Sequence, residues 1–264
     1  MKQNKNNLEY GEHHWSKKKD PRFALSIYKN RYQDVYNKLN VQKIVEYFSH
    51  DKPLRILDFG GGIGIVSLFL AKHGHKVTLA DQSPEALEAA KLFFKEEGVE
   101  GLIDIVLCDN ASNISSSQFD IIIAKDLIEH VIEDSQLIVD FSKNLVEGGK
   151  LILTTQNSFS PNYIIEGGIR RIMNPKVKWM GWDRTHIRFY NPKSLKQLLK
   201  SSSFTNIHFR STYIFPYKLF DVLIQKFIPS HKTSFLWKLD KLLYKSGFFR
   251  KFGWNIMVIA EKQL

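Results

Sequence analysis

Between residues 54 and 155, short apolar runs alternate with stretches whose residues have the spacing or the end signals of helices. The apolar runs have the length of buried strands. The expected strands are 54–59, 76–81, 102–109, 119–126 and 150–155, and the expected helices are 64–74, 83–98 and 135–149. Parallel strands need crossover helices, so the pattern predicts an α/β fold: a Rossmann-like, doubly wound sheet that helices cover on both faces.

The chain outside this alternation has a different character. Residues 1–22 have the composition of a loose arm, and apolar residues recur at helical spacing over 27–49. Residues 157–192 are rich in Asn, Gly, Trp and Arg and are expected to be irregular. The remaining expected elements are a helix at 192–202 and strands at 204–215 and 253–262.

Composition bears on compartment and on membrane insertion. Cys108 is the one cysteine among 264 residues, so no disulfide can form within the chain and a reducing, cytoplasmic compartment is expected. The first residues are polar and do not have the pattern of a signal peptide. No apolar run reaches the ~18 residues that a membrane-spanning helix needs.

The formal net charge of +11 is unevenly distributed. From Tyr213 to Leu264, nine Lys or Arg residues oppose three acidic residues, which leaves +6 in the last fifth of the chain. The same stretch is rich in Phe, Tyr and Trp. Such an excess is compatible with an anionic membrane surface, acidic substrates or nucleic acid.

Residues 213–252 are expected to form a basic, aromatic, helical insertion between the last two strands. Two apolar stripes can be drawn on helices here: Leu219, Phe220, Leu223 and Phe227 on one, and Phe235, Leu236, Leu239, Leu242 and Leu243 on the other. Lysines beside the second stripe suit a helix that lies on an anionic membrane surface. The alternative is a lid or a dimer contact. Nucleic acid is not expected, because no stacking platform is visible.

The segment "LDFGGGIG" at 57–64 follows the first expected strand and places glycines at 60, 62 and 64. Glycines at this position let a ligand approach the backbone at a helix N-terminus. The spacing is G-x-G-x-G, and Ile65 stands where a dinucleotide-binding pattern needs a small residue. Asp58 would repel a pyrophosphate but attract a cationic amine. The pattern therefore favours S-adenosylmethionine, and the alternative is a tight turn that merely needs glycine.

Polar residues at the ends of the next strands extend this candidate cofactor site. Asp81 ends the second strand, where an acid can accept hydrogen bonds from both ribose hydroxyls, and Gln82 follows it. Asp109 and Asn110 follow the third strand and could hold the adenine amino group. Lys125 ends the fourth strand near the same ligand. Each aspartate could instead be a turn residue.

Four segments carry a family resemblance: "ILDFGGGIG", "VTLADQSPEALEAAK", "AKDLIEHVIE" and "NLVEGGKLILTTQNSFS". Together they resemble class I S-adenosylmethionine-dependent methyltransferases, and most of all the bacterial group that includes ubiquinone-type O-methyltransferases. The resemblance covers about residues 41–157 well and "HIRFYNPKSLKQLL" moderately. It departs at Gly61, where that family usually has cysteine.

The resemblance implies a seven-stranded sheet whose last strand is antiparallel, with 204–215 and 253–262 as the final hairpin. It implies a methyltransferase domain at 41–264, with an acceptor-site insertion at 157–192 and the helical insertion at 213–252. Residues 1–40 would be an arm and a helix over the cofactor and acceptor site. The implied reaction is transfer of a methyl group to a nucleophile.

Candidate acceptor-site residues gather in two segments and in the arm. His130 could act as a general base or could brace the acceptor loop, and His186 is the second candidate base. The candidate acceptor-binding residues are Asp126, Trp182, Arg184, Arg188 and Trp15. Arg188 could instead clasp the loop by pairing with a core acid, and the residues beside Trp15 could be exposed to solvent.

A metal site can be considered at "DLIEH", residues 126–130, together with His186. The set loosely resembles that of metal-dependent 2′-O-methyltransferases of small RNAs, which use E-x-x-E-H and a later histidine. Here the first acid is Asp126, and the D-x-x-E-H form is common in metal-free relatives. No metal is therefore expected.

The expected function is methyl transfer to oxygen, or less readily to carbon or nitrogen, of a small-molecule, lipid-linked or saccharide-linked acceptor. The alternatives are a metal-dependent RNA 2′-O-methyltransferase and a catalytically silent protein that binds S-adenosylmethionine. Intact Asp58, Asp81 and loop glycines argue against the silent protein. The expected location is cytoplasmic, with peripheral contact to an anionic membrane surface. The sequence does not set an oligomeric state.

Overall fold

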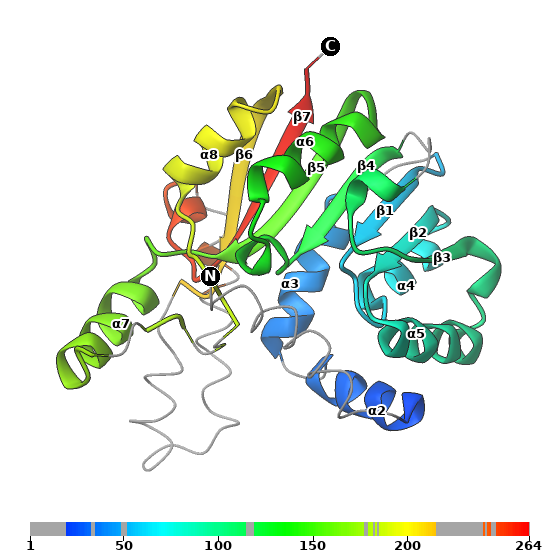
Figure 1. Ribbon diagram of the computed structural model, residues 1–264, viewed down its shortest axis with the longest axis horizontal. Coiled ribbons are helices and arrows are strands. Elements are labelled where there is room, and N and C mark those ends of the chain that lie inside the picture. Colours follow the sequence, from blue (N-terminus) through cyan, green and yellow to red (C-terminus); the bar gives the residue numbers. More distant parts are fainter. Residues whose placement is uncertain are drawn as a thin grey trace.

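A computed structural model describes the chain in segments (Figure 1). The described residues are 20–32, 35–48, 52–114, 119–176, 179–181, 183, 185–214, 240, 242–243 and 247–263. Within them the chain forms one seven-stranded sheet of order β3-β2-β1-β4-β5-β7-β6. The strands are β1 Arg55–Phe59, β2 Lys76–Asp81, β3 Ile103–Leu107, β4 Phe119–Lys125, β5 Leu145–Gln156, β6 Phe204–Thr212 and β7 Asn255–Lys262.

Strand direction confirms the expected sheet. The first five strands pair in parallel, and β7 pairs antiparallel with both β5 and β6. The chain reverses the strand order between β1 and β4, since β2 and β3 lie on one side of β1 and the later strands lie on the other. Ligands of such sheets bind at the carboxyl ends of the strands beside this reversal.

Helices cover the two faces of the sheet unequally. The helices are α2 Pro21–Tyr32, α3 Val35–Val45, α4 Ile65–Lys72, α5 Pro84–Glu97, α6 Asp134–Asn144, α7 Pro161–Met173 and α8 Pro192–Lys200. Short 3-10 turns are η1 Glu100–Leu102, η2 Ala111–Asn113, η3 Ile128–His130 and η5 Phe249–Lys251. Side chains of α2 to α5 fill one buried cluster, and side chains of α6 and α8 fill the other.

Alternating strand residues supply both clusters. In β4, Ile121 and Ile123 face the cluster of α2 to α5, whereas Ile122 and Ala124 face the cluster of α6 and α8. This is the period-two pattern of a strand that is buried on both faces. Burial of the strands on both faces explains why they are near-continuous apolar runs in the sequence.

The N-terminal helices belong to the same core. Residue 40, the expected end of the arm and helix, lies inside α3, and Pro21 already begins α2. Ala24 and Leu25 of α2 and Ile44 of α3 are buried in the cluster of α2 to α5. The expected single helical stretch over 27–49 is therefore two helices, and the first begins before the expected arm ends.

Two further expectations were wrong in detail. The helix expected to run to residue 149 ends at Asn144, because Leu145 is fully buried and already pairs with Phe119 of β4. Tertiary pairing thus overrides the local helical signal. Residues 157–192, expected to be irregular, contain α7, which Ser160 caps by accepting a hydrogen bond from the Tyr163 amide at 3.1 Å.

None of the helices in the described segments is long and apolar enough to cross a membrane. Of the insertion expected at 213–252, residues 215–239, 241 and 244–246 lie outside the described part of the chain. Its two apolar stripes therefore stay predictions.

Candidate active site

The glycine loop joins β1 to α4 in the conformation that its composition requires. Gly60, Gly62 and Gly64 all have left-handed backbones, with φ of 70°, 59° and 71°. A Cβ on Gly64 would also overlap Phe94 of α5. Glycine is therefore required here by the left-handed backbone and by the close packing, in addition to any access that it gives a ligand.

Gly61 has a packing reason of its own. A Cβ there would lie 2.5 Å from Leu79 Cδ1 and 2.7 Å from the Asp58 carboxylate. The cysteine that is usual in this position of the family would therefore need Leu79 or Asp58 to move.

Asp58 lies beneath the loop and is almost fully buried. Its Oδ2 accepts a hydrogen bond from Ser67 Oγ at 2.6 Å, and its Oδ1 has no hydrogen-bond partner among the described residues. Burial raises the pKa of this carboxyl to about 6, and the bonds from Ser67 oppose that rise. A free, buried acceptor oxygen suits a cationic donor, so binding of an amine here stays a prediction.

Asp81 ends β2 with its carboxylate turned toward the loop. Its Oδ2 accepts from the Gly62 amide at 2.8 Å and its Oδ1 from the Ser83 amide at 2.9 Å. Burial raises the pKa of Asp81, while these backbone bonds oppose the rise. Gln82 beside it is exposed. Each carboxylate oxygen has two lone pairs, so ribose hydroxyls could still bind Asp81.

Asp109 and Asn110 are exposed at the end of β3. The Asn110 side chain caps η2 by accepting from the Ser112 amide at 3.0 Å. Asp109 Oδ1 lies 3.3 Å from Asn113 Nδ2. The capping contact supports the turn alternative for Asn110, and adenine binding stays a prediction for both residues.

Lys125 and Asp126 form a pair at the end of β4, with Nζ and Oδ2 2.5 Å apart. Asp126 Oδ1 also accepts from Thr154 Oγ1 and from Asn255 Nδ2, each at 2.9 Å. Burial works against the charge of both groups, but their mutual attraction prevails: it raises the pKa of Lys125 and lowers that of Asp126. Asp126 has a left-handed backbone, with φ of 51°. This charged pair, with its strained backbone at Asp126, lies at the carboxyl edge of the sheet, between the candidate cofactor residues and the candidate acceptor residues.

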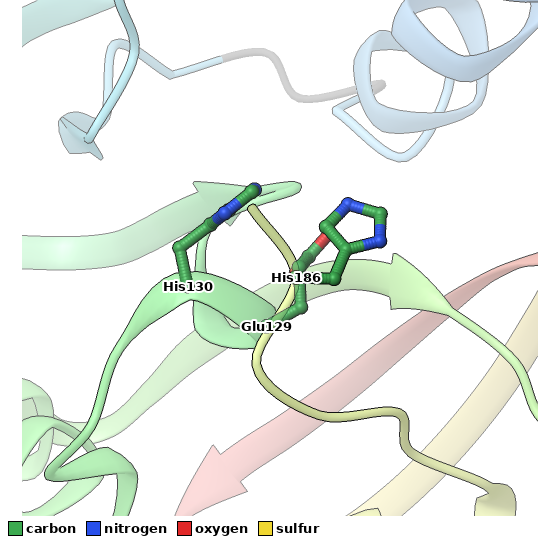
Figure 2. Close-up of side chains that lie close together, drawn as sticks. All are labelled: Glu129, His130 and His186. Carbon is green, nitrogen blue, oxygen red and sulfur yellow. The ribbon is translucent and has the colours of Figure 1, made fainter. Parts of the chain in front are cut away.

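Glu129, His130 and His186 converge beside this pair (Figure 2). Glu129 and His130 come from η3, and His186 comes from the loop before α8. The Ile187 amide donates to the Glu129 carbonyl at 3.0 Å, which fixes this loop on η3. One ligand atom from each side chain lies within 4.8 Å of the others, and the histidine ring centroids are 5.0 Å apart.

Thr185 and Asp183 orient the ring of His130. Thr185 Oγ1 lies 2.6 Å from Asp183 Oδ1 and 3.0 Å from His130 Nδ1. The hydroxyl has one proton, which goes to the carboxylate, so His130 Nδ1 donates to Thr185 and Nε2 keeps a lone pair. Burial lowers the pKa of His130, with Asp183 opposing the shift. The ring is therefore neutral at pH 7.

His186 is oriented in the same sense. Its Nδ1 lies 3.0 Å from the Met180 carbonyl, which can only accept, so its Nε2 also keeps a lone pair. Burial lowers the pKa of His186, and the neighbouring His130 adds to that shift.

Glu129 completes the cluster as a buried acid. Its Oε2 accepts from Thr155 Oγ1 at 2.8 Å, and its Oε1 has no hydrogen-bond partner in the described chain. Burial and the charge of Asp126 raise the pKa of Glu129 to about 8, which makes the carboxyl protonated at pH 7. The cluster therefore presents one proton donor beside two imidazole lone pairs.

Arg188 makes the clasp that was the alternative to acceptor binding. Its Nη1 lies 2.5 Å from Asp134 Oδ2, and its Nη2 donates to the Ile132 carbonyl at 2.6 Å. Tyr190 Oη also binds Asp134 Oδ2, at 2.7 Å. These contacts fasten the loop of His186 to the start of α6. An acceptor role for Arg188 stays a prediction.

Three sequence candidates cannot be placed. Trp15, Trp182 and Arg184 lie outside the described residues.

Lys43 is a residue that the sequence did not single out. It is almost fully buried on α3, with Nζ 3.3 Å from Thr212 Oγ1 at the end of β6. Burial lowers its pKa to about 7, although Asp240 and Asp126 oppose this. Only its helical spacing was visible in sequence, and one lysine on a helix gives no signal that its ammonium is buried at the carboxyl edge of a sheet.

Sheet topology, left-handed glycine loop, acid at the end of β2 and polar carboxyl edge together define a class I S-adenosylmethionine-dependent methyltransferase. The model of the methyltransferase domain family matches residues 30–209, more than half of the chain, and the chain belongs to that family.

The proteins similar to this chain include ubiquinone biosynthesis O-methyltransferases of Rickettsia. That of Rickettsia felis (strain ATCC VR-1525 / URRWXCal2) is 27% identical over 191 residues, which are 71% of this chain and 73% of that protein. That of Rickettsia canadensis (strain McKiel) is 30% identical over 125 residues, which are 47% of this chain and 52% of that protein. The second match spans about half the length of the relative.

A solved structure shows the same fold at lower identity. Magnesium protoporphyrin IX methyltransferase from Synechocystis PCC 6803, with bound SAH, superposes with a TM-score of 0.58 at 15% identity. The superposition covers 86% of this chain and 84% of that one.

Proposed function

We propose that this methyltransferase transfers the methyl group of S-adenosylmethionine to an oxygen of a small-molecule, lipid-linked or saccharide-linked acceptor. The observation that carries the proposal is the orientation of His130. A neutral imidazole with a free Nε2, held by Thr185 and Asp183, can take the proton of an acceptor hydroxyl. The printed names of the two Rickettsia relatives, both O-methyltransferases, support oxygen as the nucleophile.

Buried polar groups of the chain would hold the cofactor. Asp58 Oδ1 would accept from its amino group, and Asp81 would accept from its ribose hydroxyls. Lys43, whose buried Nζ lies 3.3 Å from the hydroxyl of Thr212, would pair with the carboxylate of the cofactor when protonated. Gln82, Asp109, Asn110 and Lys125 complete the proposed cofactor contacts. The bound cofactor supplies a methyl group on a sulfonium, which is a good leaving group.

The residues of the acceptor side would position the hydroxyl and remove its proton. The acceptor oxygen would form a bond to the methyl carbon while the carbon–sulfur bond breaks, and its proton would go to His130 Nε2. His186 would then share or relay that proton, since the two rings are 5.0 Å apart. Alignment and exclusion of water would supply much of the rate, and His130 the remainder.

Transfer of labelled methyl groups tests the proposal. The full chain, labelled S-adenosylmethionine and a panel of phenolic, saccharide, lipid-linked and RNA acceptors would be incubated with and without EDTA. Labelling of a hydroxyl acceptor that persists in EDTA is the expected result. Labelling only of nitrogen or carbon would contradict O-methylation, and labelling only of RNA would favour the RNA enzyme. Calorimetric titration with S-adenosylmethionine separates failure to bind cofactor from a missing acceptor.

The same cluster supports a second candidate, divalent-cation-assisted methylation. Glu129 supplies a carboxyl, which would lose its proton on binding a cation, and His130 and His186 supply two imidazoles; each of the three side chains already has one polar atom in a hydrogen bond. Such second-layer bonds typically orient metal ligands. A separation of up to 4.8 Å exceeds the roughly 4 Å that two bonds of ~2.1 Å allow, so small rotations would be needed.

Metal titration distinguishes the two candidates. Calorimetry with Zn²⁺, Mn²⁺ and Mg²⁺ on wild type and on Glu129→Gln would reveal a site by binding that the variant loses. Activity that EDTA abolishes and one of these ions restores would favour the metal. Binding of no ion, with activity intact in EDTA, would leave His130 as a base.

A further inference from the structure

The outward side of α7 is apolar over half of its circumference. At 100° per residue, positions 164, 165, 168, 169, 172 and 173 share one side of this helix. They are isoleucines, one glycine and one methionine, and the five large side chains are all exposed. Ile172 and Met173 reach 83% and 79% exposure. Contiguous exposed apolar surface of this kind usually marks a binding face.

The inward side of the same helix is fixed to the domain. Asn162, in the first turn before the apolar side begins at Ile164, donates to the Tyr213 carbonyl at 2.9 Å. Gly167 lies against Trp179 so closely that a Cβ would overlap the indole. The helix is thus held with its apolar side outward, and Figure 1 shows it at the end of the molecule away from β3.

Basic side chains border the apolar side. Arg171 lies at one edge of this side on the helical wheel and over the Tyr163 ring, with its Cζ 5.0 Å from the ring centroid. Lys176 follows the helix and is exposed. The single acid of the helix, Glu166, is buried and already paired with Arg170. The border therefore has a positive charge.

A second exposed element continues this surface. Phe159, just before α7, lies 5.4 Å from Phe252, and Phe252 lies 5.3 Å from Phe248, as measured between ring centroids. Phe248 is 72% exposed and Phe159 is 49% exposed. Arg250 and Lys251 are exposed beside them. Exposed aromatic rings beside basic residues thus adjoin the start of the helix.

We propose that α7, with Phe159 and Phe248, lies on an anionic membrane surface. A helix with an apolar side bordered by basic residues binds such a surface by burying the apolar side among acyl chains and placing the basic side chains among anionic headgroups. A second copy of the chain is a poorer partner, because it would bring an equally positive border against this one. The expected insertion at 213–252 was the earlier candidate for membrane contact; α7 is a separate surface, earlier in the chain.

The position of α7 gives this contact a consequence for the proposed reaction. Tyr163 on its inner side lies 4.8 Å from the Phe189 ring, and Phe189 lies 5.9 Å from the His186 ring. One layer of aromatic side chains therefore separates the membrane-facing helix from the acceptor cluster. Docking by α7 would bring the carboxyl edge of the sheet to the membrane.

Co-sedimentation of the full chain with vesicles tests the proposal. The vesicles are phosphatidylcholine alone and phosphatidylcholine with phosphatidylglycerol, each at low and high salt. Wild type is expected to sediment with the anionic vesicles at low salt and to be released at high salt. The double variant Ile169→Asp/Ile172→Asp should lower the partition coefficient roughly tenfold or more, and Arg171→Gln should lower it about fivefold.

Leu102→Asp is the matched control, because Leu102 is an exposed apolar residue on η1 beside β3, at the other edge of the sheet. It should bind like wild type, and circular dichroism should show all variants folded. Failure of the wild-type protein to sediment with anionic vesicles at low salt would overturn the proposal. So would undiminished binding of the double variant, or a wild-type dimer that the double variant converts to monomers.

Discussion

At the two halves of the sheet edge, buried polar groups find their hydrogen-bond partners at different separations along the sequence. In the cofactor half, residues 55–114, Asp81 binds backbone amides only 19 and 2 residues away in sequence. In the acceptor half, residues 126–214 and 247–263, Asp126 binds Asn255 across 129 residues. Thr212, also in this half, contacts Lys43 of α3 across 169 residues. The first half is built from neighbours in sequence and the second from distant strands.

The difference indicates where substitutions should act. A change in the cofactor half removes a contact that a local motif made, so cofactor affinity or local packing should respond. A change in the acceptor half disturbs groups whose protonation states depend on one another, so turnover and pH dependence should respond. The predictions below test this division.

The largest effect is expected for Gly64→Ala, in the cofactor half. The substitution combines a left-handed backbone, about 1–2 kcal/mol, with overlap against Phe94, roughly 1–3 kcal/mol. Urea denaturation should show the summed loss in the free energy of unfolding. Gly98→Ala is the control, because Gly98 has φ of 67° but open space around a Cβ. Equal losses in both variants would mean that Phe94 moves aside.

His130→Ala tests the acceptor half. Loss of the proposed base should lower kcat by about 10²–10⁴ while S-adenosylmethionine affinity stays unchanged. Thr185→Val should cause a smaller loss, because it removes only the hydroxyl that orients the ring. His73→Ala is the control, because His73 is an exposed histidine directly after α4. Unchanged turnover in His130→Ala would assign catalysis to alignment alone.

Asp81→Ala should act on binding alone. Loss of charge-assisted hydrogen bonds to the ribose should weaken S-adenosylmethionine binding by roughly 1.5–3 kcal/mol in calorimetry. Asp104→Ala on β3 is the control, because that acid is exposed. Should Asp81→Ala bind cofactor as tightly as the control, the assignment of the cofactor half would be wrong.

The smallest expected effect is the change in the free energy of unfolding for each unit of pH. Burial lowers the pKa of Lys43 to about 7, from an ordinary 10.5. Between these values the unfolded chain holds a proton that the folded chain has released, so stability rises with pH, by at most about 1.4 kcal/mol per unit. Lys43→Met should remove this rise in denaturation experiments at pH 7 to 10. An identical slope in wild type and variant would contradict the lowered pKa of Lys43.

Local signals predicted much of the cofactor half. The parallel sheet and the glycine loop between its first strand and helix follow from residues close in sequence, and the structure confirms them. The end of α6 could not be predicted, because Leu145 exchanges a helical bond for a strand partner 26 residues before it, Phe119. The helix α7 was missed because Gly167, Gly168 and the neighbouring asparagines give this stretch the composition of a loop.

In the acceptor half the sequence supplied the residues but not their states. It identified His130 and His186 as candidate bases and Arg188 as either a substrate contact or a clasp. It did not show that Asp183 and Thr185 orient one ring, nor that Met180 orients the other. Those contacts join loops whose approach is fixed by η3 and by the bond from Ile187 to Glu129.

By itself the sequence determined the fold class, the glycine loop and the acid at the end of β2, because backbone sterics, strand periodicity and helix caps act over a few residues. Only the tertiary structure decided which groups are charged. Glu129 and Lys43 have ordinary pKa values in an extended chain, and burial shifts these pKa values to about 8 and 7; Asp126 adds to the shift of Glu129, whereas Asp240 and Asp126 oppose the shift of Lys43. Desolvation depends on everything that surrounds a side chain, and residues distant in sequence supply most of that surrounding.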